Sequence, residues 1–197
     1  MSDSIALVHN GIIENFRELK EGMRVQGIEF DSDTDTEVLA KLIGVHYKGN
    51  LLKAVLGALS QVRGTYGICV MSDEEPDTIV TARMGSPIVL GVGTDGNLIS
   101  SDPSALLVHT KDVIYLEDGE CAVVKKDSYE ILTMAGEKLE KTPETIDWDV
   151  ESVQKQGYEH FMLKEIFEAP EVIENTIRGR LLVEKGRAKL GGLESVL

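Results

Sequence analysis

The spacing of apolar residues along this chain changes at Arg63 and Gly64. After one short strand, the apolar residues before this point recur every three or four positions, which is typical of amphipathic helices. Beyond it, short apolar runs alternate with turns rich in Gly, Asp and Pro, which is typical of antiparallel hairpins. Helices grouped at one end and hairpins at the other predict an α+β fold rather than repeated βαβ units.

The first part of the chain carries clear start and stop signals. We expect a strand at Ile5–His9 that ends at Asn10-Gly11, followed by a helix whose apolar face runs from Ile12 to Met23. Thr34 and Glu37 have capping-box spacing and predict the start of a second helix. Asn50 is the expected cap of a third.

The sequence after Gly64 predicts a series of strands, followed by a connecting segment. The expected strands span residues 66–71, 78–83, 88–92, 98–100, 113–116, 121–124 and 129–133. Asp102-Pro103 predicts a short helix, and two further helices are expected at 159–166 and from Pro170 onward. We therefore expect one domain over residues 1–140 and a connecting segment with helices over residues 141–197.

Composition excludes several classes of function. The chain has 34 acidic and 20 basic residues, a net charge of −14, which disfavours sequence-independent binding to nucleic acid or to anionic membranes. With 197 residues, 42% of them hydrophobic, it can bury a sizeable core. No apolar run approaches the roughly 20 residues that a membrane span needs. We expect a cytoplasmic protein.

Sequence motifs for metals and cofactors are missing. Cys69 and Cys121 lie inside apolar runs and are expected to be core residues, and the four histidines share no ligand spacing. The glycines of Gly91–Gly96 lie in an expected hairpin, which disfavours a phosphate loop. We expect neither a metal nor a cofactor.

Two short segments are candidates for chemistry. Asn10-Gly11, between a strand and a helix, could supply a side-chain amide and a backbone N–H to an oxyanion, or could be a simple turn. Asp33 and Asp35 could hold a cationic group of a ligand, or could only complement the helix dipole. Taken alone, the residues favour the simpler alternative in both cases.

The stretch His9–Asn15, HNGIIEN, resembles a motif of the class II glutamine amidotransferases, most closely in the branch that aminates fructose 6-phosphate. Further segments agree with this family in the same order along the chain. They are Ser32–Glu37 (SDTDTE), Arg63–Gly67 (RGTYG), Ala82–Pro87 (ARMGSP) and His160–Glu168 (HFMLKEIFE). The resemblance extends from about residue 5 to about residue 182.

The resemblance implies a fold, a reaction and three site residues. The fold would be an Ntn-hydrolase-type αββα sandwich of antiparallel sheets. In this family an N-terminal cysteine attacks the glutamine amide, its own α-amino group is the base, and the ammonia passes to fructose 6-phosphate on another domain. Asn10 and Gly11 would form the oxyanion hole, and Asp35 would bind the α-ammonium of glutamine.

The chain also departs from this family. The nucleophilic cysteine and a glutamine-gripping loop lie upstream of the first motif in the family, and nothing here matches either of them. We therefore expect a sandwich that is incomplete at its N-terminus and no glutaminase activity. We also expect association into a homo-oligomer, or a rearrangement, that covers exposed strand edges and apolar faces. Ser2 as a replacement nucleophile is a less favoured alternative; glutamate release that Ser2→Ala abolishes would support it.

Two other functions are open at this point. The chain could belong to another branch, such as the phosphoribosyl-pyrophosphate amidotransferases, although the segment His160–Glu168 speaks against it. It could also be a non-catalytic module that binds glutamine or serves as a scaffold.

Overall fold

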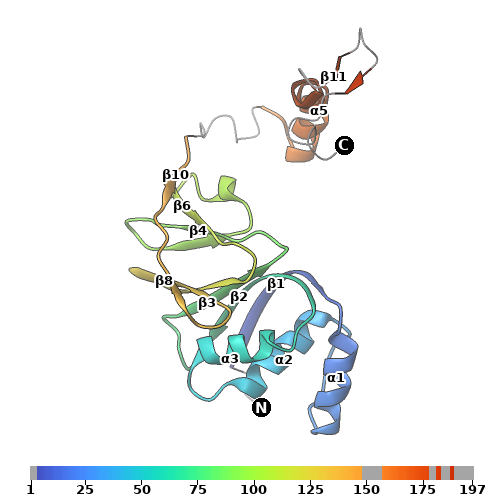
Figure 1. Ribbon diagram of the computed structural model, residues 1–197, viewed down its shortest axis with the longest axis vertical. Helices are drawn as coiled ribbons and strands as arrows, with labels where there is room; N and C mark the ends of the chain where they lie inside the picture. The colour runs from blue at the N-terminus through green and yellow to red at the C-terminus, as the bar shows by residue number, and fades with distance from the viewer. Residues whose placement is uncertain (1–3, 148–156, 178–180, 183–186, 189–197) are drawn as a thin grey trace. The chain divides into compact units, whose positions relative to one another are not determined.

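The structure is a computed structural model that describes residues 4–147, 157–177, 181–182 and 187–188. The chain divides into two compact units, Met1–Asp147 and Trp148–Leu197. The first unit contains the expected helices followed by the expected hairpins (Figure 1). The α+β fold class is therefore confirmed.

Two antiparallel sheets form the framework of the first unit. The larger has, in spatial order, β1 (Ile5–Ile13), β2 (Gly64–Ser72), β3 (Ile79–Met84), β7 (Glu120–Lys125), β8 (Ser128–Thr133) and β9 (Lys138–Leu139). The smaller has β10 (Glu144–Thr145), β6 (Asp112–Tyr115), β4 (Val89–Gly91) and β5 (Leu98–Ser100). β1 and β5 are edge strands of their respective sheets.

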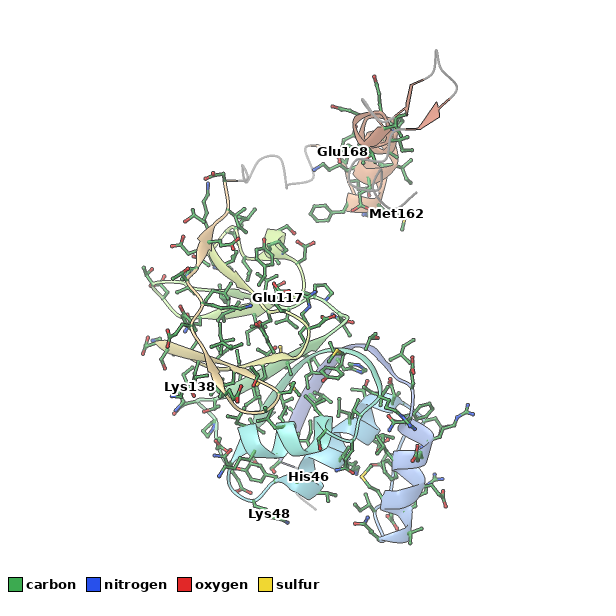
Figure 2. All side chains as sticks on the ribbon, in the orientation of Figure 1. His46, Lys48, Glu117, Lys138, Met162 and Glu168 are labelled. Carbon is green, nitrogen blue, oxygen red and sulfur yellow. The ribbon has the colours of Figure 1, made fainter. Side chains whose placement is uncertain are left out.

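The helices of this unit are α1 (Phe16–Val25), α2 (Asp35–His46) and α3 (Leu51–Leu59). The expected caps are confirmed: the Thr34 hydroxyl accepts from the N–H of Glu37, and the Asn50 side chain accepts from the N–H of Lys53. Apolar side chains of the helices pack on one face of the large sheet. Figure 2 draws the side chains on the ribbon.

A second core lies on the opposite face of the large sheet. This core contains Leu90 of β4, Ile114 of β6 and Ile88, which directly precedes β4. They pack against Ala122 and Val124 of β7. Neighbouring residues of β7 therefore serve different cores, because successive side chains point to opposite faces of a strand. Residues 4–147 thus supply a helical layer and both sheets of an αββα sandwich.

The structure corrects the prediction for the first strand. β1 does not end at Asn10-Gly11 but continues to Ile13, and α1 begins only at Phe16. Ile12, which the periodicity assigned to the helix, lies in the strand with 66% of its surface exposed. The strand continues because β2 pairs with it along its whole length, as far as the partners Ile13 and Gly64.

The later elements differ in detail from the predictions. The helix after Asp102 is a single 3-10 turn, Pro103–Ala105. In the second unit one helix, α5 (Phe161–Ile177), passes through Pro170, where a new helix was expected. A proline removes one hydrogen bond from a helix but does not have to end it.

β10 lies beyond residue 140 and pairs with β6, so the first unit extends to Asp147. The functional division at residue 140 stays a prediction. The second unit also has the short paired strands β11 (Leu181–Leu182) and β12 (Arg187–Ala188). In the described parts of the chain, no helix combines the length and apolar character required to cross a membrane.

Candidate functional site

The outer edge of β1 presents backbone groups in a defined order. The N–H of Glu14 donates to the Arg63 carbonyl and the N–H of Asp73 donates to the Ser4 carbonyl, so the even-numbered residues of β1 point their backbone groups toward β2. In an antiparallel ladder the alternate residues point the other way. The N–H of Gly11 is therefore directed away from β2, at the edge of the sheet.

Only glycine fits at position 11. Its φ is +128°, and a Cβ at this position would lie 2.2 Å from the carbonyl oxygen of Thr65. Gly64, across the strand pair, has φ +133° and a similarly close approach to the carbonyl oxygen of Ile12. The two glycines of the HNG and RGTYG segments thus allow β1 and β2 to stay paired through a distorted stretch.

Asp35 is attached to the same edge of β1. Its Oδ2 accepts a hydrogen bond of 2.8 Å from the N–H of Ile13, two residues beyond Gly11. The carboxylate is the first residue of α2, where the helix dipole favours a negative charge. Asp33, the other candidate carboxylate, instead pairs with Lys20 at 3.1 Å and is exposed.

Asn10 lines a cavity between the edges of the two sheets. The cavity has a volume of about 310 Å³, and its lining includes Val8 and Asn10 of β1, Cys69 of β2, and Ile99 and Ser100 of β5. An amide side chain on this wall can donate to an oxygen atom inside the cavity. The structure therefore brings Asn10, Gly11 and Asp35 together around the last residues of β1.

Some residues that hold this arrangement were not identified from the sequence. His9 Nδ1 lies 3.2 Å from Thr36 Oγ1, in the first turn of α2. Asn15 accepts from the N–H of Arg63 at 2.8 Å and donates to the Gln61 carbonyl at 2.9 Å, so it joins the end of β1 to the start of β2. These contacts span 27 to 48 positions of sequence, and no local pattern signals them.

The N-terminus of α2 is held by more than its cap. Glu37 accepts hydrogen bonds from the N–H groups of Asp31 and Ser32, at 2.8 and 2.7 Å, and from the Ser32 hydroxyl. Burial alone would raise the pKa of Glu37, but these bonds and the charge of Lys41 outweigh it, so the pKa lies below its usual value. The loop before Asp35 is thus tied to the helix.

The two cysteines have properties of unreactive thiols. Burial and the neighbouring Glu120 raise the pKa of Cys121 to about 11. Burial also raises the pKa of Cys69, although the side chain of Thr81 partly opposes this. Cys69 lines the cavity next to Asn10, but a raised pKa leaves little thiolate near neutral pH, which disfavours a nucleophilic role.

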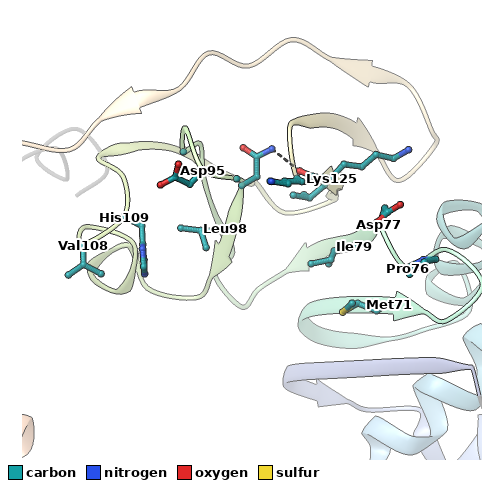
Figure 3. Close-up of a pocket in the computed structure, with 14 residues that line it drawn as sticks. Met71, Pro76, Asp77, Ile79, Asp95, Leu98, Val108, His109 and Lys125 are labelled. Carbon is teal, nitrogen blue, oxygen red and sulfur yellow. Dashed lines mark hydrogen bonds between the residues drawn. The ribbon is translucent and has the colours of Figure 1, made fainter.

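A larger cavity, of about 570 Å³, lies elsewhere in the first unit (Figure 3). Its lining includes apolar side chains such as Met71 and Leu98, with His109 and Lys125 nearby. The Asn97 side chain, which also lines it, donates to the Lys125 carbonyl at 2.9 Å. It shares no lining residue with the cavity beside Asn10, so it is separate from the β1 edge.

The chemistry of the β1 edge follows from its groups. A carboxylate next to a helix N-terminus can bind an ammonium ion, while an outward backbone N–H and an amide side chain can stabilise a developing oxyanion. A ligand with both an ammonium group and a carbonyl or amide group would match this pair of features.

The chain resembles known proteins in sequence. The sequence profile of the glutamine amidotransferase domain family matches residues 1–108. A glutamine–fructose-6-phosphate aminotransferase (isomerizing) of Chlorobaculum tepidum is 49% identical over all of this chain and 33% of its own length. Enzymes of the same name from Thermotoga maritima and Thermus thermophilus are 46% identical over 91% and 95% of the chain. The chain spans about a third of the length of these curated relatives.

A solved structure supports the same grouping. The glutamine phosphoribosylpyrophosphate amidotransferase of B. subtilis, complexed with ADP and GMP, matches with a TM-score of 0.59 and 26% identity, over 68% of this chain and 30% of that one. Its fold is of the Ntn-hydrolase type, as the sequence resemblance implies. Profile, relatives and fold agree, and this chain belongs to the glutamine amidotransferase domain family.

Proposed function

We propose that the first unit is the glutaminase part of a glutamine–fructose-6-phosphate aminotransferase and that glutamine binds at the outer edge of β1. The observation that carries this proposal is the placement of Asp35 and Gly11 on one strand edge. The Asp35 carboxylate accepts from Ile13, and the N–H of Gly11 points outward two residues earlier.

Each residue has a separate role in this proposal. The Asp35 carboxylate binds the α-ammonium of glutamine through a charge-assisted hydrogen bond. The side-chain amide of Asn10 and the N–H of Gly11 stabilise the negative oxygen that forms when a nucleophile attacks the glutamine amide. The closely similar relatives carry the name of an enzyme that uses fructose 6-phosphate, which supports this sugar phosphate as the ammonia acceptor of the whole protein.

Calorimetric titration of the chain with glutamine tests the proposed site. We expect saturable binding, with an affinity of about millimolar because a single ion pair and two neutral donors hold the ligand. Glutaramate, which has the amide but no α-ammonium group, should bind much more weakly.

Variants at the two acidic positions provide the control. Asp35→Asn should weaken glutamine binding at least about tenfold, because it removes the charge opposite the ammonium group. Asp33→Asn removes an equal charge two residues away and should leave the affinity unchanged. Equal binding by wild type and Asp35→Asn would overturn the assignment of the ammonium site.

A further inference from the structure

β1 is attached to the first turn of α2 by two contacts, one on each side of Asn10-Gly11. Before this pair, His9 Nδ1 lies 3.2 Å from Thr36 Oγ1. After it, the N–H of Ile13 donates to Asp35 Oδ2 at 2.8 Å. The stretch of β1 that carries the proposed oxyanion donors is therefore held at both ends by consecutive residues of one helix.

The helical side of this attachment is anchored by hydrogen bonds and by burial. The Thr34 hydroxyl and the Glu37 carboxylate both hold the start of α2, and the buried residues Val38 and Leu39 fix its next turn in the core. Because α2 is anchored in this way, we expect the contact through Thr36 to set where residue 9 of β1 lies. The neighbouring contact through Asp35 sets where residue 13 lies.

The donor and the acceptor of each hydrogen bond in this contact can be assigned. Among the residues that the structure describes, the buried Nε2 of His9 has no partner. An unpaired buried N–H is rarer than an unpaired acceptor, which assigns the ring proton to Nδ1. His9 then donates to Thr36, and the Thr36 hydroxyl can direct its own proton to Asp35 Oδ1, 3.5 Å away.

We propose that His9 and Thr36 are positioning residues that set the separation between the outward N–H of Gly11 and the carboxylate of Asp35. This inference rests on the proposed function, since it says how one ligand can engage both groups. Neither His9 nor Thr36 needs to touch glutamine in this arrangement. Thr36 acts through His9 on β1 and directly on the orientation of the adjacent carboxylate.

Removal of the Thr36 hydroxyl tests the inference on the whole 197-residue chain. Thr36→Val keeps the shape of the side chain and should weaken glutamine binding about tenfold, which is the effect of one hydrogen bond worth about 1.4 kcal/mol. Thr36→Ser keeps the hydroxyl and should restore the affinity of the wild type. Weakened binding in both variants would indicate a packing role and overturn the inference.

A matched control is available at Thr110. Its part-buried hydroxyl donates to the Val92 carbonyl at 2.7 Å, in a different region of the first unit. Thr110→Val should lower the melting temperature as much as Thr36→Val does but leave glutamine affinity unchanged. If Thr36→Val and Thr110→Val lose glutamine affinity equally, the loss follows from lower stability, and a positioning role for Thr36 is contradicted.

A second measurement does not depend on glutamine. Amide hydrogen exchange of Ile13, followed by NMR, should be about tenfold faster in Thr36→Val than in the wild type or Thr36→Ser, because Asp35 holds this N–H less firmly. If the Ile13 amide of Thr36→Val exchanges at the wild-type rate, the inference is overturned. If wild type does not bind glutamine but the exchange rates change as expected, the proposed function fails and the positioning contact stands.

Discussion

Gly11 is a residue whose backbone conformation is tightly constrained by the facing strand. Replacement by alanine would force a Cβ against the Thr65 carbonyl at a φ that only glycine adopts readily. We expect Gly11→Ala to lower the free energy of unfolding by more than about 3 kcal/mol, because backbone strain and a backbone clash add. Urea unfolding followed by circular dichroism measures this loss.

A substitution at Gly27 separates the effect of backbone strain from the effect of the clash. This glycine has φ +82°, but a Cβ there meets no atom within 4 Å. Gly27→Ala should therefore show only the strain of a left-handed alanine, about 1–2 kcal/mol. If Gly11→Ala lowers the free energy of unfolding no more than Gly27→Ala does, β1 moves away from Thr65 without an energetic cost.

The cysteines allow a chemical test at the same scale. Because the pKa of Cys121 is raised to about 11 and that of Cys69 is also raised, little thiolate exists at about pH 8. We expect iodoacetamide to modify neither thiol of the native protein within the time that it modifies both in urea, as counted by intact mass. Rapid alkylation of native Cys69 would contradict this and reopen its role beside Asn10.

At the scale of elements, three family segments that are far apart in sequence converge. Tyr66 of the RGTYG segment pairs with Gly11 of β1 and forms a bridge to Gly85 of the ARMGSP segment. Gly85 in turn donates its N–H to Asp118 at 2.9 Å. These segments therefore form one end of three adjacent strands, next to the proposed glutamine site.

The start of α2 predicts a dependence of stability on acidity. The pKa of Glu37 is lower in the folded chain than in the unfolded chain, so its contribution is complete above the unfolded value of about 4.5 and is lost as the pH falls through the folded value. Glu37→Gln should be less stable than wild type at pH 7, and this difference should shrink toward about pH 3. Urea unfolding at several pH values measures both.

Glu21 supplies the control for this experiment, because its exposed carboxylate has only a 4.0 Å contact with Arg24. Glu21→Gln should be about as stable as wild type at pH 7. A difference between Glu37→Gln and wild type that is constant with pH would show that the charge of Glu37 is not what holds the loop.

At the scale of the whole molecule, the first unit should be stable by itself. Residues 4–147 contain a core between the helices and the large sheet and another between the two sheets. A chain that ends at Asp147 should therefore melt within about 2 °C of the first unit in the full chain, a difference no larger than the shift that about 1 kcal/mol produces in a unit of this size. A fall of more than about 5 °C, followed by circular dichroism, would show that residues 148–197 stabilise it.

The sequence by itself determined the local features of this protein. The caps at Thr34 and Asn50, the switch from helices to hairpins and the family segments all depend on residues within a few positions of one another, so the α+β class and the resemblance could be predicted. The end of β1 could not be, because β2, more than fifty positions later, decides how far the strand continues.

Tertiary structure alone decided how the candidate site is built. The sequence suggested a strand-to-helix turn at Asn10-Gly11, but the structure has a strand edge on which Gly11 points outward and α2 holds both sides. The direction of a backbone N–H depends on the register with a distant strand, and the partner of His9 depends on how a helix packs. Such long-range pairing leaves no trace in local spacing, which is the physical reason that His9 and Thr36 emerged only from the fold.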